Sequence, residues 1–519
     1  MKEGGSMGSS NCVPEESTRL ITLLGISKTP FEWFALVLGP VIYFAFLFAP
    51  LGGTITQQGG LGIIAWSAWW WGTGCLPTGY VMAVPILGTA FLPGMKFGPV
   101  LQTLIHPGIG MILGPALIVC MWSRWGFTRR MALFCLSKVG TSVRAQAVTW
   151  LLLSASISFF VANVVIAIAM TPIALEMLKA VGYDTASKLR KSKECMLIVI
   201  AIGIGASVGG FLTPMAGGQA VITWTQLSEA LGFQVSMISF TVTMFVPVIL
   251  SLIPVAILFG CIFPVDIKSF AGSTEFFKEQ LRELGPLTKS EIWGIVIFLL
   301  AIALPFLMPV WRPYLPESLD INPSLIFTCV TVILAILPAP DQGAPVKPFP
   351  YQPNERLLSF NAIKILPVQA FLIWPTAMSI SLLVNMTGTT TLLAQVIDGF
   401  WNLEPYTGTG LFTLFCGVLG NAASDTGAAG MIAPILAKAT LESGVNPVPW
   451  LLMMGYTVNF AFMVPSATGT MALPIALEGK ASWRLPVYGF FCSVACCLVS
   501  WAFWGTVLAR NWTFFMTLS

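Results

Sequence analysis

The chain has 519 residues, of which 56% are hydrophobic and only 9% are charged, and its mean hydropathy is +0.83. Because soluble domains carry about a quarter charged residues, this composition excludes an ordinary soluble domain. The net charge of +4 comes from Lys and Arg residues scattered between apolar runs, so we expect no nucleic-acid partner. The chain is therefore predicted to be a polytopic membrane protein in contact with lipid.

After a polar start, the chain alternates long apolar runs with short polar connections. Residues 1–30 are expected to form a cytoplasmic N-terminal tail. The apolar run that starts at Phe31 is too long and too far from the N-terminus for a cleaved signal peptide, so it is expected to be the first span. Runs near the roughly 20 residues needed to span a bilayer recur to the C-terminus. The predicted single spans are 31–51, 60–74, 77–93, 103–123, 194–222, 237–262, 291–310, 323–339, 366–386, 449–475 and 486–509.

Two further apolar segments, 146–180 and 409–439, are predicted to be hairpins that enter the membrane and return. Near the second hairpin only Lys438 is positive, so we expect it to enter from outside. The first hairpin has positive residues on both sides, which places its ends in the cytoplasm. These residues are Arg124, Arg129, Arg130, Lys138 and Arg144 before it, and Lys179, Lys188, Arg190, Lys191 and Lys193 after it.

Positively charged residues are enriched in cytoplasmic loops, and on this basis two polar linkers are also placed in the cytoplasm. They are 265–290, predicted to be a short amphipathic helix, and the proline-rich stretch 338–356. The expected fold class is an all-α polytopic membrane protein with about 11 transmembrane helices and two re-entrant hairpins. Its expected location is the plasma (inner) membrane, with the N-terminus cytoplasmic.

The eleven cysteines and the single histidine give no sign of a metal centre. Most of the cysteines, such as Cys492, Cys496 and Cys497, lie inside apolar runs, where a reduced thiol acts as a small apolar residue. His106 precedes Pro107 near the start of a span and is expected to be structural. No cofactor and no metal beyond a coupling Na+ are expected. An intramembrane enzyme is a remote alternative because an H-E-x-x-H motif is absent and a single histidine leaves little for acid–base chemistry, and a channel is a second one.

The two hairpins resemble each other and are each followed by an interrupted span. Asn163 precedes Pro172 by nine residues, and Asp425 precedes Pro434 by nine residues. The interrupted spans contain GASVGGFLTPMAGGQ (205–219) and VPSATGTMALP (464–474). Glycines 205, 209 and 210 are expected to let the first one unwind, although small residues also serve helix packing. Paired hairpins and broken helices indicate an inverted-repeat secondary transporter, whose site lies where the helices break.

These features resemble the divalent anion/sodium symporter family, which carries succinate, malate, citrate or sulfate. The segments WSAWWWGTGCLPTGYVMAVPIL (66–87), RWGFTRRMALFCL (124–136) and SVGGFLTP (207–214) are also similar to it. The resemblance implies a homodimer in which each protomer has a fixed scaffold and a transport domain that moves like an elevator. The scaffold would comprise 31–137 and 291–390, and the transport domain 146–264 and 409–509, with 265–290 as the linker helix.

The resemblance also assigns the binding residues. Substrate carboxylates would be held by two Ser-Asn-Thr triplets and by a hydroxyl from each broken helix. The matching positions are Asn163, Ser207, Ser424, Asp425, Thr426 and Thr468. Cations would be held, partly through backbone carbonyls, by Ser158, Asn163 and Ala206 on one side and by Gly420, Ala423, Asp425 and Ala467 on the other.

The chain departs from the family pattern at these positions. The first triplet is Ala162-Asn163-Val164 and the second is Ser424-Asp425-Thr426. The family's Pro-Pro-Asn after each broken-helix threonine is replaced by Gly217-Gly218-Gln219 and by Gly469-Thr470-Met471. An acid therefore stands where the family has an amide, and several hydroxyl ligands are missing.

Intramembrane acids are functional by default, and a charged Asp425 beside a dianionic substrate would be repelled at low effective dielectric. It could bind a cation, carry a coupling proton, or face a positive group on the substrate; otherwise it is a protonated acid bonded to backbone at the hairpin tip. The leading hypothesis is a carrier of small dianions of the succinate, malate, 2-oxoglutarate and citrate class. Its mode is anion exchange or Na+- or H+-coupled uptake, with exchange modestly favoured. Sulfate, a sulfonate or an amino dicarboxylate is the alternative substrate.

Overall fold

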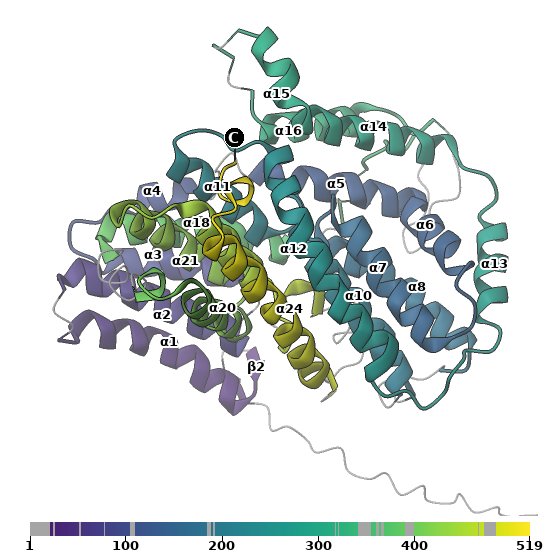
Figure 1. Cartoon of the computed structure of the whole chain (residues 1–519), viewed down its shortest axis with the longest axis horizontal. Coiled ribbons are helices and arrows are strands. Elements are labelled where there is room, and N and C mark those ends of the chain that lie inside the picture. The colour runs from purple at the N-terminus through teal and green to yellow at the C-terminus, as the bar shows by residue number, and fades with distance from the viewer. Residues whose placement is uncertain are drawn as a thin grey trace, which may run out of the picture.

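The computed structural model describes residues 21–518, with gaps at 24–25, 51–52, 77, 104–108, 184–187, 190–191, 317, 320, 341–353, 360–362, 365–367, 390–398, 465–466 and 472–483. The described part is built almost wholly of helices (Figure 1). His106 and most of the linker 338–356 lie outside the described residues, so the predictions for them stay predictions.

The first half of the chain runs from the N-terminal strands to the linker helix. It contains β1 (Ile21–Leu23), β2 (Ile26–Lys28), α1 (Pro30–Phe48), α2 (Ile55–Thr73), η1 (Thr78–Met82), α3 (Ala83–Ala90), α4 (Phe97–Gln102), α5 (Ile109–Trp125), α6 (Phe127–Leu136), α7 (Val143–Ser158), α8 (Asn163–Ala180), α10 (Lys193–Gly209), α11 (Gly218–Leu231), α12 (Met237–Ile257), η3 (Leu258–Ile262) and α13 (Ser273–Glu283).

The second half runs from the end of the linker helix to the C-terminal helices. It contains α14 (Lys289–Phe306), α15 (Met308–Trp311), η4 (Arg312–Tyr314), α16 (Pro323–Ile336), α18 (Val368–Thr387), α20 (Pro405–Ala422), α21 (Asp425–Glu442), α22 (Pro447–Val458), α24 (Arg484–Ala509) and η5 (Thr513–Phe515).

The helices agree with the predicted apolar segments in position, with local differences. Among the described residues, five helices are both long and apolar enough to cross a bilayer: Pro30–Phe48, Asn163–Ala180, Met237–Ile262, Lys289–Phe306 and Arg484–Ala509. The predicted span 77–93 is instead divided between the short helices η1 and α3. The number of spans and the re-entrant course of the hairpins stay predictions.

The end of the predicted N-terminal tail is ordered. β1 and β2 pair as a short antiparallel hairpin, with Ile21 opposite Lys28. Helix α1 then begins with a capping box, in which the Thr29 hydroxyl accepts from the amide of Glu32 and the Glu32 carboxylate accepts from the amide of Thr29. Such reciprocal bonds satisfy amides that a helix start leaves without partners. The described end of the predicted tail thus has local structure, and the assignment of residues 1–30 to a cytoplasmic tail stays a prediction.

Two of the three glycines that we expected to unwind the first broken span serve helix packing instead. Gly205 and Gly209 lie within α10, which packs along α7. A Cβ at Gly205 would meet the carbonyl oxygen of Leu151, and one at Gly209 would meet the backbone of Ala155. Their hydrogens let the two helices approach closely, as small residues commonly do in membranes. The break begins only at Gly210.

The polar linker 265–290 contains the predicted helix, α13, which lies beside α6 and α8 at one edge of the molecule (Figure 1). Arg130 of α6 donates to the Glu291 carboxylate at the start of α14, at 2.8 Å, and to the carbonyls of Leu284, Gly285 and Pro286. This side chain joins the two halves of the predicted scaffold through the end of the linker.

A second link between the halves is a buried ion pair. Arg124, in the last turn of α5, forms a two-pronged contact with Glu355, at 2.9 Å and 2.6 Å. Both side chains are shielded, with exposures of 0% and 1%. Ser359 donates to the same carboxylate, and Trp125 Nε1 donates to the carbonyl of Leu357 at 2.8 Å. These bonds hold residues 354–359 against the end of α5.

We expect Glu355→Ala to lower the melting temperature of the detergent-solubilised protein substantially. Removing one partner of a buried ion pair costs about 3–5 kcal/mol, because the other charge loses its compensation. The control is Glu404→Ala, which removes an exposed carboxylate bonded to Thr407 and should shift the melting temperature little. Equal melting temperatures for the two variants would contradict a stabilising role for the Arg124–Glu355 pair.

Candidate functional site

Four helix starts define the centre of the candidate site. α8 begins at Asn163 and α21 begins at Asp425, each after a short break that follows the preceding helix of the predicted hairpin. α11 begins at Gly218, and a helical turn begins at Gly469, each after the break that interrupts a predicted span. A helix start presents amide hydrogens and partial positive charge, so their convergence favours an anion.

Each hairpin tip is bonded to the break that follows it. The amide of Asn163 donates to the carbonyl of Ala216 at 2.9 Å, and the amide of Asp425 donates to the carbonyl of Ala467 at 2.9 Å. Ala216 and Ala467 each lie two residues after a proline, Pro214 or Pro465. The two halves thus use the same contact at equivalent positions, as an internal repeat predicts.

Each break also packs against the hairpin of the other half. A Cβ at Gly218 would lie 2.8 Å from the Thr426 side chain, and one at Gly469 would lie 2.9 Å from the Val164 side chain. Such distances are too short for a side chain, so these two positions require glycine. The four helix starts are therefore parts of one centre.

Asp425 lies at this centre and is 5% exposed. Its Oδ1 accepts from the amide of Thr426 at 2.5 Å, from the Thr426 hydroxyl at 3.1 Å and from the Ser424 hydroxyl at 3.4 Å. Thr468 follows Ala467, whose carbonyl accepts from the Asp425 amide. The carboxylate is thus an acceptor at the positive end of α21, where a negative charge is stabilised. Three of the six predicted substrate residues, Ser424, Asp425 and Thr426, are bonded to one another here.

Asn163 occupies the equivalent place in the first half. Its Oδ1 accepts from the amide of Val164 at 2.8 Å, as Asp425 does from Thr426. Asn163 and Ser158, two members of the first predicted cation set, both lie beside Gly210. A Cβ at Gly210 would be 2.9 Å from Asn163 Cβ and 3.2 Å from Ser158 Oγ. Ser158 in turn donates to the carbonyl of Ala206 at 2.8 Å. Ser158, Asn163 and Ala206 are therefore brought together as predicted.

The second predicted cation set is brought together in part. Asp425 and Ala467 share a hydrogen bond, and Ala423 lies two residues before Asp425 in the same break. Gly420 packs against the backbone of Val458 instead, and no contact described for it involves Asp425. Carboxylate, hydroxyl and carbonyl oxygens are suitable ligands for a small hard cation, so both sets have the chemistry that Na+ requires.

The remaining predicted residue, Ser207, is joined to the others through residues that the sequence analysis did not assign. Ser207 Oγ lies 2.5 Å from Thr470 Oγ1, which lies 3.2 Å from Thr468 Oγ1. Asn459 donates to the carbonyl of Ser207 at 2.8 Å and accepts from Gln219 at 2.5 Å. All of these side chains are buried. Polar residues in a buried apolar run need partners, which is the sequence signal that could have identified Asn459 and Thr470.

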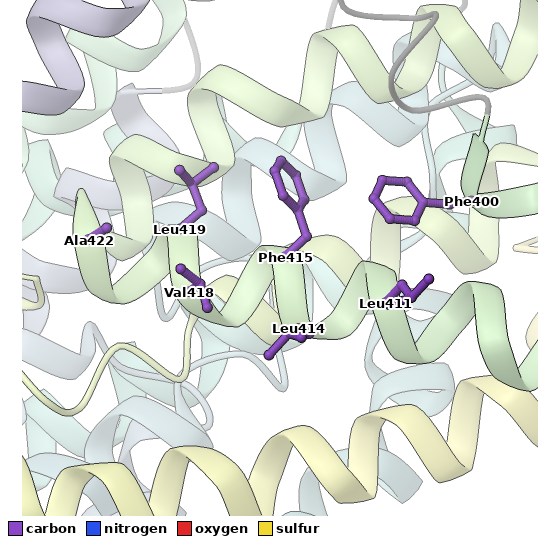
Figure 2. Close-up of a pocket in the computed structure, with 7 residues that line it drawn as sticks. All are labelled: Phe400, Leu411, Leu414, Phe415, Val418, Leu419 and Ala422. Atoms are coloured by element: carbon purple, nitrogen blue, oxygen red, sulfur yellow. The ribbon is translucent and has the colours of Figure 1, made fainter.

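A pocket of about 360 Å³ lies elsewhere, along the outer side of α20. Its lining, shown in Figure 2, consists of Phe400, Leu411, Leu414, Phe415, Val418, Leu419 and Ala422. None of these side chains is polar, so the pocket offers nothing to an anion or a cation. Leu414 and Val418 are more than half exposed, which suits a surface that faces lipid.

Comparisons with known proteins identify the family of the chain. The chain matches the family described as "Sodium:sulfate symporter transmembrane region" over residues 32–511. It is 26% identical over 471 residues to the sodium-dependent dicarboxylate transporter SdcS of Staphylococcus saprophyticus, covering 88% of this chain and 87% of that protein. It is 24% identical over 491 residues to SdcS of Staphylococcus aureus, covering 90% of each.

Among solved structures, the chain is similar to the Alcanivorax borkumensis YdaH transporter, with 12% identity and a TM-score of 0.44 over 93% of this chain and 98% of that one. The family match spans nearly the whole described chain and both halves of the site, and the names of the family and of the relatives are those of transporters rather than enzymes. The chain belongs to the sodium:sulfate symporter family of membrane transporters, the divalent anion/sodium symporters.

Proposed function

We propose that the protein is a secondary active transporter that moves small dianionic carboxylates across the membrane together with Na+. The observation that carries this proposal is the convergence of four helix starts and ten buried polar side chains at one centre. The names of the relatives, sodium-dependent dicarboxylate transporters, support both the substrate class and the cation.

The substrate carboxylates would lie between the two hairpin tips. There Asn163 supplies a side-chain amide, and Ser207 and Thr468 supply hydroxyls from the broken helices. The Ser424 and Thr426 hydroxyls, which donate to Asp425 in the structure, would turn toward the substrate when it binds. Helix starts stabilise anions without a fixed cation. We therefore place the succinate, malate, 2-oxoglutarate and citrate class at this centre.

Asp425 would be the residue that makes anion binding depend on a cation. A carboxylate close to a dianion raises the energy of the bound state unless a positive charge lies between or beside them. A Na+ held by Asp425 and the neighbouring Thr468 hydroxyl would remove that repulsion. It would also compensate for hydroxyl ligands that the first triplet, Ala162-Asn163-Val164, has lost.

The division into a scaffold (31–137 and 291–390) and a transport domain (146–264 and 409–509) is supported by packing. α5 packs against α14 and α16 within the first group, and α12 packs against α24 within the second. The groups meet where α18 packs against α21 and where Gly427 of α21 lies against the Trp71 ring of α2. An elevator movement would slide the second group along this surface. The homodimer and the cytoplasmic N-terminus belong to the same proposal.

The coupling is tested by uptake of labelled succinate into proteoliposomes. We expect an inward Na+ gradient to drive accumulation into vesicles that contain no dicarboxylate, because a carrier coupled to Na+ needs no counter-anion. Uptake that requires internal dicarboxylate and ignores Na+ would instead establish the alternative, anion exchange. Competition by sulfate, a sulfonate or an amino dicarboxylate in the same assay would identify a substrate outside the simple dicarboxylates.

The role of Asp425 is tested by Asp425→Asn, which keeps the shape of the side chain and removes its charge. We expect the Na+ concentration for half-maximal uptake to rise on the order of tenfold or more, a factor worth about 1.4 kcal/mol. Glu229→Gln, which neutralises an exposed acid at the far end of α11, is the matched control and should leave the Na+ dependence unchanged. If Asp425→Asn shifts the pH profile instead, Asp425 carries a proton; if it changes neither, Asp425 has no part in coupling.

A further inference from the structure

Asn421, near the end of α20, joins the first arm of the second predicted hairpin to the break that follows α22. Its Nδ2 donates to the carbonyl of Phe460 at 3.0 Å, and its Oδ1 accepts from the amide of Met463 at 3.0 Å. Nδ2 also donates to the carbonyl of Gly417, one turn earlier in α20, at 2.9 Å. The last bond is local and common for asparagine in a helix, but the other two reach a segment 39 and 42 positions further along the chain.

These three bonds use the donor capacity of the Asn421 side chain completely. Its two hydrogens go to the two carbonyls, and its oxygen takes the hydrogen of the Met463 amide. Because a carbonyl only accepts and a backbone amide only donates, one orientation of the side chain fits all three partners. Asn421 therefore has no hydrogen left for a substrate anion, and its contacts are those of a residue that holds other segments in place.

The backbone of the break depends on this side chain at one point in particular. Among the described residues, Asn421 Oδ1 is the only acceptor of the Met463 amide. The Phe460 carbonyl, in contrast, also accepts from the Ser493 hydroxyl of α24 at 2.6 Å. An amide without a partner is strongly unfavourable at membrane depth. Loss of the Asn421 side chain would therefore displace the backbone at Met463 more than at Phe460.

A backbone bond joins the same hairpin to the same break four residues further on. The amide of Asp425 donates to the carbonyl of Ala467 at 2.9 Å. Asn421 and Met463 are 42 positions apart in the chain, as are Asp425 and Ala467, so the two bonds align the hairpin and the break in one register. The proposed Na+ ligands, Asp425 and Thr468, belong to these two segments and lie at the second bond.

The first half contains a corresponding contact that is made by a different residue. The Thr213 hydroxyl, in the break after α10, donates to the carbonyl of Phe159, directly after α7, at 2.5 Å. In each half a side chain thus joins the end of the first hairpin arm to the break, in addition to the backbone bond at the hairpin tip. This recurrence indicates that the contact belongs to the architecture of the site.

We propose that Asn421 is a positioning residue for the cation: by fixing the break at Met463, it sets the separation between the Thr468 hydroxyl and the Asp425 carboxylate. This inference rests on the proposed function, in which these two groups hold Na+. Asn421 itself is a ligand of neither Na+ nor substrate. Residues that orient metal ligands typically change metal affinity by about 10- to 100-fold when they are removed, and we expect an effect of this size.

The test is the binding of radiolabelled sodium to the purified full-length protein, at constant ionic strength in choline chloride, for the wild type, Asn421→Leu and Asn446→Leu. Leucine has the same branched shape as asparagine and forms no hydrogen bonds. Asn446, before the start of α22, is the matched control because it also donates to a backbone carbonyl, that of Met516, and accepts from a backbone amide, that of Val448. Both asparagines are half-buried, so the two variants should lose similar thermal stability.

Asn421→Leu should raise the dissociation constant for Na+ by about 10- to 100-fold, whereas Asn446→Leu should leave it unchanged. If a leucine variant does not fold, the pair Asn421→Ala and Asn446→Ala decides. An unchanged dissociation constant in the Asn421 variant, or an equal rise in the Asn446 variant, would overturn the positioning role. A wild type that shows no saturable Na+ binding would instead overturn the proposed cation site, and this role with it.

Discussion

The site depends on how the protein satisfies the backbone where its helices are interrupted. Unpaired amides and carbonyls cost several kcal/mol each in a membrane, so non-helical backbone is tolerated only when it is enclosed by protein or lines a wet cavity. Here the amide of Asn163 is bonded to Ala216, and that of Asp425 to Ala467. Each bond therefore joins a hairpin tip to the break that follows it.

This constraint explains which glycines the centre needs. Gly218 and Gly469 lie where each break meets the opposite hairpin, at Thr426 and Val164, and neither position has room for a Cβ. The close approach brings four helix starts together, and helix starts carry partial positive charge. Among the contacts described at the centre, none involves a lysine or an arginine. An acid in such a place is stabilised by the same helix start that would attract a substrate. The competition between Asp425 and an anion for this potential is the physical basis of the proposed coupling.

Much of this arrangement was predictable from the sequence because the signal was local. Apolar runs gave the helix positions, and the nine-residue spacing before Pro172 and Pro434 identified the equivalent tips. The role of Gly205 and Gly209 was misjudged, because a glycine that permits unwinding and one that permits packing look the same without the neighbouring helix. Asn459 and Thr470 were missed for a related reason: their partners, Ser207 and Gln219, are more than 200 positions away in the chain.

The claim on which the account turns is that Asp425 meets a cation. Binding of radiolabelled sodium to the purified protein tests it without any assumption about substrate or transport. The account predicts saturable binding by the wild type and a clear loss of affinity in Asp425→Asn, with Glu229→Gln unchanged. Equal sodium binding by the wild type and Asp425→Asn would contradict it.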